Sequence, residues 1–360
     1  MRGWWWLWSR CPGIGVARMR SLEAAAAEHG VELADLWGWS SSRLGQALSW
    51  PQSVLDQIDR YRLARGTSPD LKVPANALLP GDAAWPPSLN QLNQPPLGLF
   101  FEGEPALIEA LAQQRAVAVV GTRASSSHGL RMAKDLGRAL ALAGWPVLSG
   151  LADGIDGAVH HGCLEAGGAP VAVLGTPLTR VYPRHHEALQ RRIARSGLLL
   201  SEHGPGTPVQ RRHFASRNRL LVAFACAVVV VECPERSGAL ITARLAHELQ
   251  RPVWVVPGDA GRLSTRGSNA LLQDRAAPLL SPAALIRHLG AGPLPQPSSG
   301  RSEAQHHQAV LNALGEGLSL DELSQQMGRP VGALARELLE LELDGQVLCE
   351  SGLHWRPVRR

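Results

Sequence analysis

The 360-residue sequence is poor in lysine, and its five cysteines follow no recognisable pattern. Only two of the 36 basic residues are lysines. The cysteines include no C-x-x-C pair and have no histidine at metal-ligand spacing, so neither a disulfide framework nor a metal site is predicted. Reduced thiols of this kind are typical of the cytoplasm, where we expect the protein.

Long apolar segments are absent as well. No apolar run reaches the roughly 18 residues that a membrane-spanning helix needs. The tryptophan-rich start at residues 1–8 carries one positive charge and lacks a small-residue cleavage site. We therefore interpret it as core packing of a first domain rather than a signal peptide, and predict no membrane association.

The common signatures of nucleotide and serine chemistry are also missing. No G-x-G-x-x-G follows the first strand of the α/β region described below, and no Gly-Lys-Ser/Thr P-loop occurs. The serines lack the nucleophile elbow of Ser-His-Asp enzymes. The sequence thus gives no support to a dinucleotide cofactor or to a serine nucleophile.

What is present is enough apolar sequence for a packed core, together with an excess of arginine. Hydrophobic residues make up 45% of the chain and charged residues 19%, and the net charge is +5. A basic balance permits a polyanionic partner without requiring one. Arginine is also the better bidentate phosphate ligand.

Between 116 and 280, apolar segments alternate regularly with helical patterns. We predict strands at 116–120, 146–149, 170–174, 197–200, 227–231 and 252–256. Helices are predicted between them, at 128–143, 155–166, 184–195, 212–224 and 238–250. Buried strands that alternate with helices indicate a parallel sheet with right-handed crossovers. The fold class is therefore α/β, with a doubly wound Rossmann-like domain.

The flanking segments differ from this core. We predict a helical domain at 1–78, the α/β core at 79–290 with a lead-in strand at 97–101, a linker at 291–302 and a winged-helix domain at 303–360. The turn Cys11-Pro12-Gly13-Ile14-Gly15 is similar to the hairpin of helix-hairpin-helix modules that bind DNA, and a plain helical turn is the alternative.

The predicted winged helix has three helices, at 304–314, 319–327 and 331–344, and then a hairpin at 345–356. The third helix of such domains normally reads DNA. From 303 to 344, however, eight acids stand against two arginines. Because phosphate repels an acidic surface, we interpret this domain as a protein-contact module rather than a DNA reader.

Small and polar residues follow most of the predicted strands. The first strand ends at Gly121-Thr122-Arg123 and the second at Ser149-Gly150. Ligands of doubly wound sheets bind at the carboxyl ends of the strands, so we predict a shallow rim of backbone donors there. The turn after the first strand would bind an anion with the helix N-terminus behind it, assisted by Arg123. A simple turn with a surface arginine is the alternative.

Residues 210–219 concentrate charge. They contain four arginines, with one phenylalanine, Phe214, among them. From 184 to 275 the chain has 14 arginines and seven acids. Arginines neutralise phosphates, and an exposed aromatic ring stacks on a base, which together hold single strands. A solvated helix with Phe214 in the core is the alternative.

One further pair is of interest, Asp156 and His160, one helical turn apart. An acid and a histidine at this spacing can exchange protons. More often such a pair braces a loop, and we predict that role here.

These segments together resemble the DNA-processing protein A family, DprA, also called Smf. The matching segments are Val119-Val120-Gly121-Thr122-Arg123-Ala124-Ser125, Ser149-Gly150-Leu151-Ala152-Asp153-Gly154-Ile155-Asp156 with His160, Val181-Tyr182-Pro183, Ser201-Glu202-His203, Phe214-Ala215-Ser216-Arg217-Asn218-Arg219, Val231-Glu232, the stretch from Ser237 to Ala243, and Val256-Pro257-Gly258. The match covers about 85–280 in order and spacing.

The resemblance implies a homodimeric protein that binds and protects single-stranded DNA and loads the RecA recombinase onto it in natural transformation and recombination. It implies no catalytic reaction and no cofactor. The implied single-stranded DNA site consists of Gly121, Thr122, Arg123, Ser149, Gly150, Arg211, Phe214, Arg217, Asn218 and Arg219. The sequence departs from the family pattern at Thr176-Pro177-Leu178-Thr179, Ala223-Phe224 and Arg275-Ala276-Ala277.

Two other functions remain open. A nucleotide or nucleoside-phosphate hydrolase would use the same rim, with Glu202 or Glu232 as its acid. A pure adaptor built on the winged helix would not bind DNA through the core.

Overall fold

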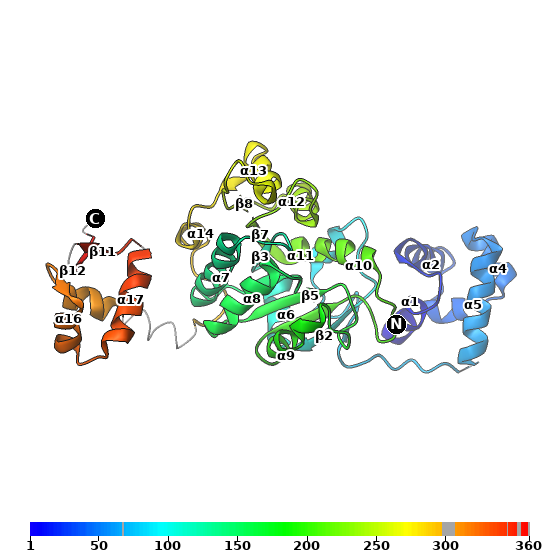
Figure 1. The fold of residues 1–360 in the computed structure, drawn as a ribbon. Coiled ribbons are helices and arrows are strands. Elements are labelled where there is room, and N and C mark those ends of the chain that lie inside the picture. The colour runs from blue at the N-terminus through cyan, green and yellow to red at the C-terminus, as the bar shows by residue number, and fades with distance from the viewer. Residues whose placement is uncertain (67, 297–306, 344, 351–353, 359–360) are drawn as a thin grey trace. The chain divides into compact units, whose positions relative to one another are not determined.

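The segments predicted as strands between 116 and 256 form one sheet in the computed structural model (Figure 1). The structure describes residues 1–66, 68–296, 307–343, 345–350 and 354–358. It divides into two units, Met1–Pro295 and Gln296–Arg360. Parts of the predicted linker (297–302), of the helix at 304–314 (304–306), Asp344 and the hairpin turn at 351–353 lie outside the described residues.

The first unit begins with five helices: α1 (Arg2–Ser9), α2 (Val16–Glu28), α3 (Leu33–Trp37), α4 (Ser41–Leu48) and α5 (Gln52–Arg65). Trp8, Trp37 and Trp39 are buried in the interior of this bundle together with several leucines, and Trp8 is fully buried. Arg62 donates hydrogen bonds to the carbonyl oxygens of Leu36 and Trp39. Gly13, in the turn between α1 and α2, has a φ of 83°, a conformation that favours glycine. The tryptophan-rich start is therefore core packing, as predicted.

Nine strands make up the central sheet, in the order β1-β2-β6-β5-β4-β3-β7-β8-β9. The strands are β1 (Ala77–Leu78), β2 (Leu99–Gly103), β3 (Ala116–Val120), β4 (Val147–Ser149), β5 (Pro170–Leu174), β6 (Leu198–Ser201), β7 (Ala225–Val230), β8 (Val253–Val255) and β9 (Ala277–Pro278). Strands β3 to β9 pair in parallel with one another, whereas β1 and β2 are antiparallel to each other and β2 is antiparallel to β6. The order reverses between β3 and β7, so the sheet is doubly wound as predicted.

Helices cover both faces because alternate residues of a strand point to opposite sides. Val117 and Val119 of β3 face α7 (Ser127–Leu142) and α8 (Ile155–Glu165). Ala118 and Val120 face the other layer. Other helices of this unit are α6 (Ala106–Ala112), α9 (Glu187–Ser196), α12 (Gly238–Glu248), α13 (Arg266–Gln273) and α14 (Pro282–Leu289), with short 3-10 turns at η1 (Pro87–Gln91), η2 (Arg184–His186) and η3 (Leu263–Thr265).

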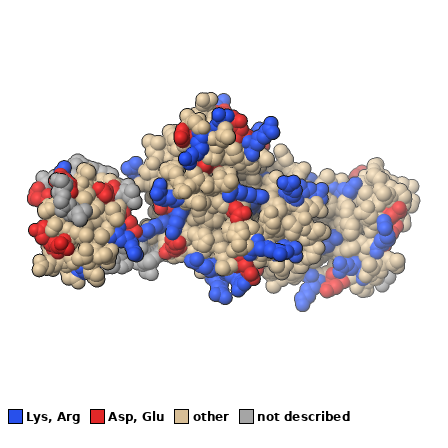
Figure 2. All heavy atoms as spheres, viewed as in Figure 1, with Lys and Arg blue, Asp and Glu red and all other residues tan. Residues whose placement is uncertain are grey.

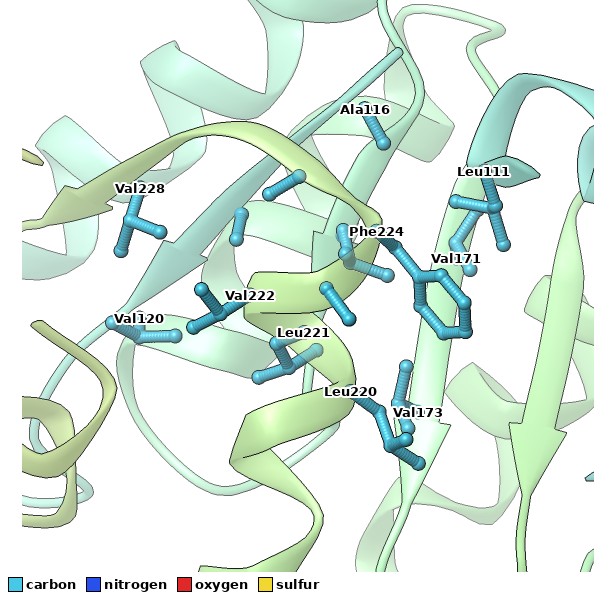
Figure 3. Packing of buried hydrophobic residues seen from close by; sticks show 14 of the residues in the cluster. Leu111, Ala116, Val120, Val171, Val173, Leu220, Leu221, Val222, Phe224 and Val228 are labelled. Carbon is cyan, nitrogen blue, oxygen red and sulfur yellow. The ribbon is translucent and has the colours of Figure 1, made fainter. Parts of the chain in front are cut away.

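The helix predicted at 212–224 is two helices, α10 (Arg211–Ser216) and α11 (Asn218–Phe224), which meet at Arg217. Figure 3 shows the apolar residues of α11 packed against β3, β5 and β7. Phe224 is fully buried among them. Ala223-Phe224 is one of the departures from the family pattern, and here the ring of Phe224 fills the core.

Residues of the second unit form a winged helix. Residues 307–314 are helical, followed by β10 (Leu318–Ser319), α16 (Leu320–Met327), α17 (Val331–Leu343), β11 (Val347–Glu350) and β12 (His354–Pro357). The three strands pair in the order β10-β12-β11. A capping box between Ser319 and Glu322 starts α16.

Three further observations bear on the predictions. The first part of the predicted linker is attached to the core, because the amides of Gly292 and Leu294 donate to the carbonyl oxygens of Ala143 and Gly144. No described helix is long and apolar enough to cross a membrane. All five cysteines are free thiols.

Candidate nucleic-acid interface

The turn after β3 is fixed by its own hydrogen bonds. A Cβ at Gly121 would lie 2.4 Å from the Ile155 side chain, so the close approach of α8 requires glycine here. The amide of Thr122 donates to the carbonyl oxygen of Glu232 (2.7 Å), and the Thr122 carbonyl oxygen accepts from the amide of Ile155. The Thr122 amide is therefore not available to an external anion.

The N-terminus of α7 already holds an anion from the chain itself. Ser126 caps this helix, and its amide and hydroxyl both donate to Oε2 of Glu232, at 3.0 and 2.8 Å. Only 2% of Glu232 is exposed, and a Cβ at Gly129 would lie 2.2 Å from the same carboxylate oxygen. The prediction that this helix end binds an external anion is wrong, because the sheet places the end of β7 beside it.

Three side chains gather at the surface next to this turn, and we call them the aromatic–arginine patch: Arg123, Tyr182 and Phe214. The Arg123 guanidinium lies 5.7 Å from the centroid of the Phe214 ring. The rings of Tyr182 and Phe214 are 4.8 Å apart and inclined by 47°. Phe214 is half-buried and Tyr182 is 47% exposed, so Phe214 is not a core residue.

Phe214 belongs to a segment that crosses the carboxyl ends of several strands. Its ring packs on Gly175 after β5, where a Cβ would approach Phe214 Cδ1 to 2.9 Å. Arg217 covers Gly150 after β4, and Asn218 donates to the carbonyl oxygen of Gly238 at the start of α12. Helices α10 and α11 thus lie over part of the predicted rim of backbone donors, at the ends of β4 and β5 and at the start of α12.

The outer face of α10 adds positive charge beside the patch. Arg211 and Arg212 are exposed. On the opposite face, His213 stacks on His203 with ring centroids 3.9 Å apart. Burial lowers the pKa of both imidazoles, that of His203 to about 4. Figure 2 shows basic side chains spread over the visible face of the first unit, with acidic ones among them.

Arg217 is an internal residue, which corrects its assignment to the DNA site. It is 4% exposed and donates hydrogen bonds to the Val173 carbonyl oxygen and to Oδ1 of Asn218. Burial lowers its pKa to about 10, an effect that the nearby carboxylate of Asp156 opposes. A guanidinium held in this way cannot reach a phosphate.

Ser149 and Gly150 lie in the same internal layer beneath the patch. The Ser149 hydroxyl donates to the Val119 carbonyl oxygen at 2.6 Å. Asp156 accepts hydrogen bonds from the amides of Gly150 (3.1 Å) and Ala152 (3.4 Å), and burial raises its pKa. Both Ser149 and Gly150 are buried, so neither residue can contact a DNA strand bound at the surface of this structure.

Contrary to the prediction, His160 does not brace the loop after β4. It is completely buried, and neither ring nitrogen has a hydrogen-bond partner among the described residues. Burial lowers its pKa to about 3, so the imidazole is neutral at physiological pH. Asp156 organises the loop through its backbone contacts, and His160 adds no hydrogen bond to it.

Arg219 is committed to an ion pair. Its two terminal nitrogens lie 2.8 and 2.6 Å from the oxygens of Glu202, and its Nε donates to the carbonyl oxygen of Gln94. A bidentate pair of this kind is strong. Glu202 is thereby engaged, and Glu232 caps α7. Both oxygens of Glu202 and Oε2 of Glu232 are committed to these contacts, whereas Oε1 of Glu232 is buried with no hydrogen-bond partner among the described residues.

Sequence reasoning missed Tyr182 and the capping role of Glu232. Tyr182 belongs to a segment that matched the family pattern, but nothing local indicated that its ring meets Phe214. The available signal was an aromatic residue in a proline-containing loop at the carboxyl end of a predicted strand, where binding residues gather.

Comparison with known proteins decides the family. Residues 76–290 match the family model of DNA recombination-mediator protein A, and residues 293–352 match the DprA winged helix domain. The chain belongs to the DprA family. Protein Smf of Synechocystis sp. is 33% identical over 297 residues, which cover 81% of this chain and 74% of the relative. A putative DNA processing protein DprA of Mycobacterium tuberculosis is 40% identical over 275 residues, 73% of this chain and 69% of the relative.

Solved structures agree with this assignment. The X-ray structure of DprA from Streptococcus pneumoniae covers 80% of this chain and 98% of its own, with a TM-score of 0.67 and 27% identity. A DprA structure from Helicobacter pylori, described for its single-stranded DNA binding mode, covers 57% of this chain and 92% of its own, with a TM-score of 0.52 and 29% identity.

Proposed function

We propose that this DprA-family protein binds single-stranded DNA on the aromatic–arginine patch and on the exposed arginines of α10, Arg211 and Arg212. The observation that carries this proposal is the Arg123 guanidinium beside the half-buried ring of Phe214, 5.7 Å from its centroid. A cation next to a stacking platform suits a phosphate and its adjoining base. Binding of this kind tolerates any sequence, because every base has a π-face.

The DNA site of this proposal is smaller than the one expected from the sequence. Arg123, Arg211 and Phe214 contact the strand, with Tyr182 and Arg212 added. Gly121, Thr122, Ser149, Gly150, Arg217, Asn218 and Arg219 build the surface from beneath. The hydrogen bonds of Arg217, Asn218 and Arg219 hold the junction of α10 and α11 against the neighbouring segments, which supports a positioning role.

Two partners belong to the same proposal. The protein delivers the protected strand to RecA, and it acts as a homodimer in the cytoplasm during natural transformation and recombination. Family membership supports both partners. The winged helix is assigned to protein contacts, because eight acids stand against two arginines from 303 to 344 and phosphate repels an acidic surface.

No catalytic step is part of this function. Glu202 and Glu232, the acids available to a hydrolase at the rim, are both engaged in internal contacts. We infer that the protein works by binding alone. A panel of nucleotides incubated with the protein should release neither base nor phosphate.

A salt titration tests the DNA site. Affinity for a labelled dT oligonucleotide is measured by anisotropy at several salt concentrations, since log K falls with log salt by about 0.7 for each phosphate contacted. Arg123→Ala and Arg211→Ala should each weaken binding and reduce the slope by about 0.7. Arg287→Ala, which removes an exposed arginine of α14, is the matched control and should behave as wild type. Wild-type slopes for both patch variants would refute the site.

Recombinase delivery has its own test. RecA filaments are assembled on single-stranded DNA that is coated with a single-strand-binding protein. The full chain should relieve the block to assembly, and Arg211→Ala should relieve it less. Light scattering coupled to size-exclusion chromatography measures the oligomeric state separately. Tight DNA binding without relief of the block would remove the mediator role and leave a DNA-binding protein.

A further inference from the structure

We propose that Asp153, His185 and His186 form a site for a divalent transition-metal ion, with Zn²⁺ as its natural occupant. The ligand atoms of these three side chains all lie within 4.8 Å of one another. Asp153 comes from the loop between β4 and α8, and the histidines come from η2. The inference is independent of DNA binding.

The ligand set has the composition that zinc prefers. Two imidazoles and one carboxylate make up a common three-ligand zinc site, in which water occupies the fourth position. Magnesium and calcium favour sites made of oxygen ligands alone. Two nitrogen ligands out of three therefore point to zinc or a neighbouring late transition metal.

His186 is oriented as a metal ligand should be. Its Nδ1 lies 3.1 Å from the carbonyl oxygen of Leu151, to which it can donate. With the proton on Nδ1, the lone pair is on Nε2, which lies on the side of Asp153. Metal-binding histidines usually donate their other ring N–H to a carbonyl oxygen or carboxylate in this way. Leu151 is buried and has a φ of 57°, an uncommon conformation for a residue with a side chain.

The distances between ligand atoms fit a metal after a small adjustment. Nε2 of His185 lies 2.7 Å from Oδ1 of Asp153, and Nε2 of His186 lies 3.9 Å from the same oxygen. Tetrahedral bonds of about 2.0–2.1 Å separate ligand atoms by roughly 3.3 Å, which is between these values. His185 is the ligand that must move, and its side chain is 68% exposed and free to do so.

An occupied site would link two loops at the carboxyl ends of β4 and β5. Only Pro183 separates Tyr182 of the aromatic–arginine patch from η2. The metal would therefore fix the loop that carries Tyr182 to the loop that carries Asp153. This predicts a stability gain from zinc even without DNA.

Direct metal binding tests the site. Tag-free full-length protein is stripped with a chelator and titrated with Zn²⁺ by calorimetry near pH 7.5. We expect one tight ion per chain and an increase in Tm. Co²⁺ in its place should give the strong visible absorption of a tetrahedral nitrogen–oxygen site.

Variants distinguish this site from adventitious binding. Asp153→Asn and His186→Gln should each lower Zn²⁺ affinity at least about tenfold, the loss that even an outer-shell contact can produce. His128→Gln, which changes an exposed histidine at the start of α7, should bind Zn²⁺ as wild type does. Circular dichroism without metal confirms that each variant folds. Absence of stoichiometric binding, or equal affinity in the ligand variants, would overturn the proposal and leave a surface His–Asp pair.

Discussion

The Arg123 guanidinium lies beside the ring of Phe214, 5.7 Å from its centroid, although the two residues follow strands that are not neighbours. Arg123 follows β3 and Phe214 follows β6, and β4 and β5 lie between these strands. The contact exists because α10 runs back across the strand ends. It places a cation and a stacking surface at one point of the molecule.

Loss of the Phe214 ring should weaken DNA binding without changing its salt dependence. Phe214→Ala is expected to reduce affinity for oligo-dT by about 1–3 kcal/mol, the usual contribution of one base–aromatic stack. No charge is removed, so the slope of log K against log salt should stay the same. Phe214→Tyr keeps the ring and serves as the control. A changed slope, or wild-type affinity for Phe214→Ala, would show that no base stacks there.

Arg217 should matter for stability because it is buried close to Asp156. Arg217→Met removes the cation and leaves the carboxylate in an apolar layer. Loss of one partner of a buried pair costs about 3–5 kcal/mol, and we expect the lower end, since Asp156 keeps two backbone donors. Urea unfolding followed by circular dichroism measures this.

The double variant Arg217→Met with Asp156→Asn is the control for that result. Removing both charges should recover part of the lost stability. If Arg217→Met unfolds at the wild-type urea concentration, the guanidinium has no structural role, and its assignment to the DNA surface would stand again.

Glu232 should stabilise the start of α7. Glu232→Ala leaves the amide and hydroxyl of Ser126 without their shared acceptor, which should cost about 1–3 kcal/mol of unfolding free energy. Glu232→Gln keeps one oxygen acceptor and should cost less. Glu235→Ala, an exposed acid three residues on, is the matched control. Equal stability of the Ala variants at both positions would mean that the cap contributes nothing.

His160 should make the protein sensitive to acid. Its pKa falls from the usual 6.5 to about 3 on folding because burial disfavours the charged ring. Below pH 6.5 the unfolded chain therefore binds a proton that the folded chain does not. Stability from this group is complete above pH 6.5 and declines as the pH falls toward 3, by up to about 1.4 kcal/mol per pH unit.

Replacement of His160 by leucine tests this pH dependence. Unfolding free energies at pH 7 and pH 5 should differ less for His160→Leu than for the wild type. His128→Leu, at an exposed position, should keep the wild-type difference. An unchanged pH dependence in His160→Leu would mean that folding does not change the pKa of this imidazole.

Most of the fold could be predicted because short apolar runs and helical periods in the sequence indicate its strands and helices. Strands such as β3 and β5 are short apolar runs between helical periods, and a strand buried on both faces needs no information from elsewhere. The start of α16 is local in the same way, because its capping box joins Ser319 and Glu322, three residues apart. The predicted bounds of helices and strands differ from the observed bounds by a few residues. No sequence pattern indicated the break between α10 and α11.

The candidate site was predicted less well, and the arginines show why. Arg211 and Arg217 belong to the same cluster in the sequence, yet one is exposed and the other lies over Gly150 in the interior. Charge and spacing alone do not distinguish them. The metal ligands illustrate the same limit, because Asp153 and the histidines at 185 and 186 meet only when β4 and β5 lie side by side.

The sequence by itself determined the parallel α/β sheet, the winged helix and the presence of arginines around Phe214, since each depends on neighbouring residues. Only the tertiary structure decided which of these groups face solvent. Ser126 and Glu232 are 106 residues apart, and their contact removes an anion site that the turn alone would offer. Such contacts depend on strand order, which is set by long-range packing rather than by any local period.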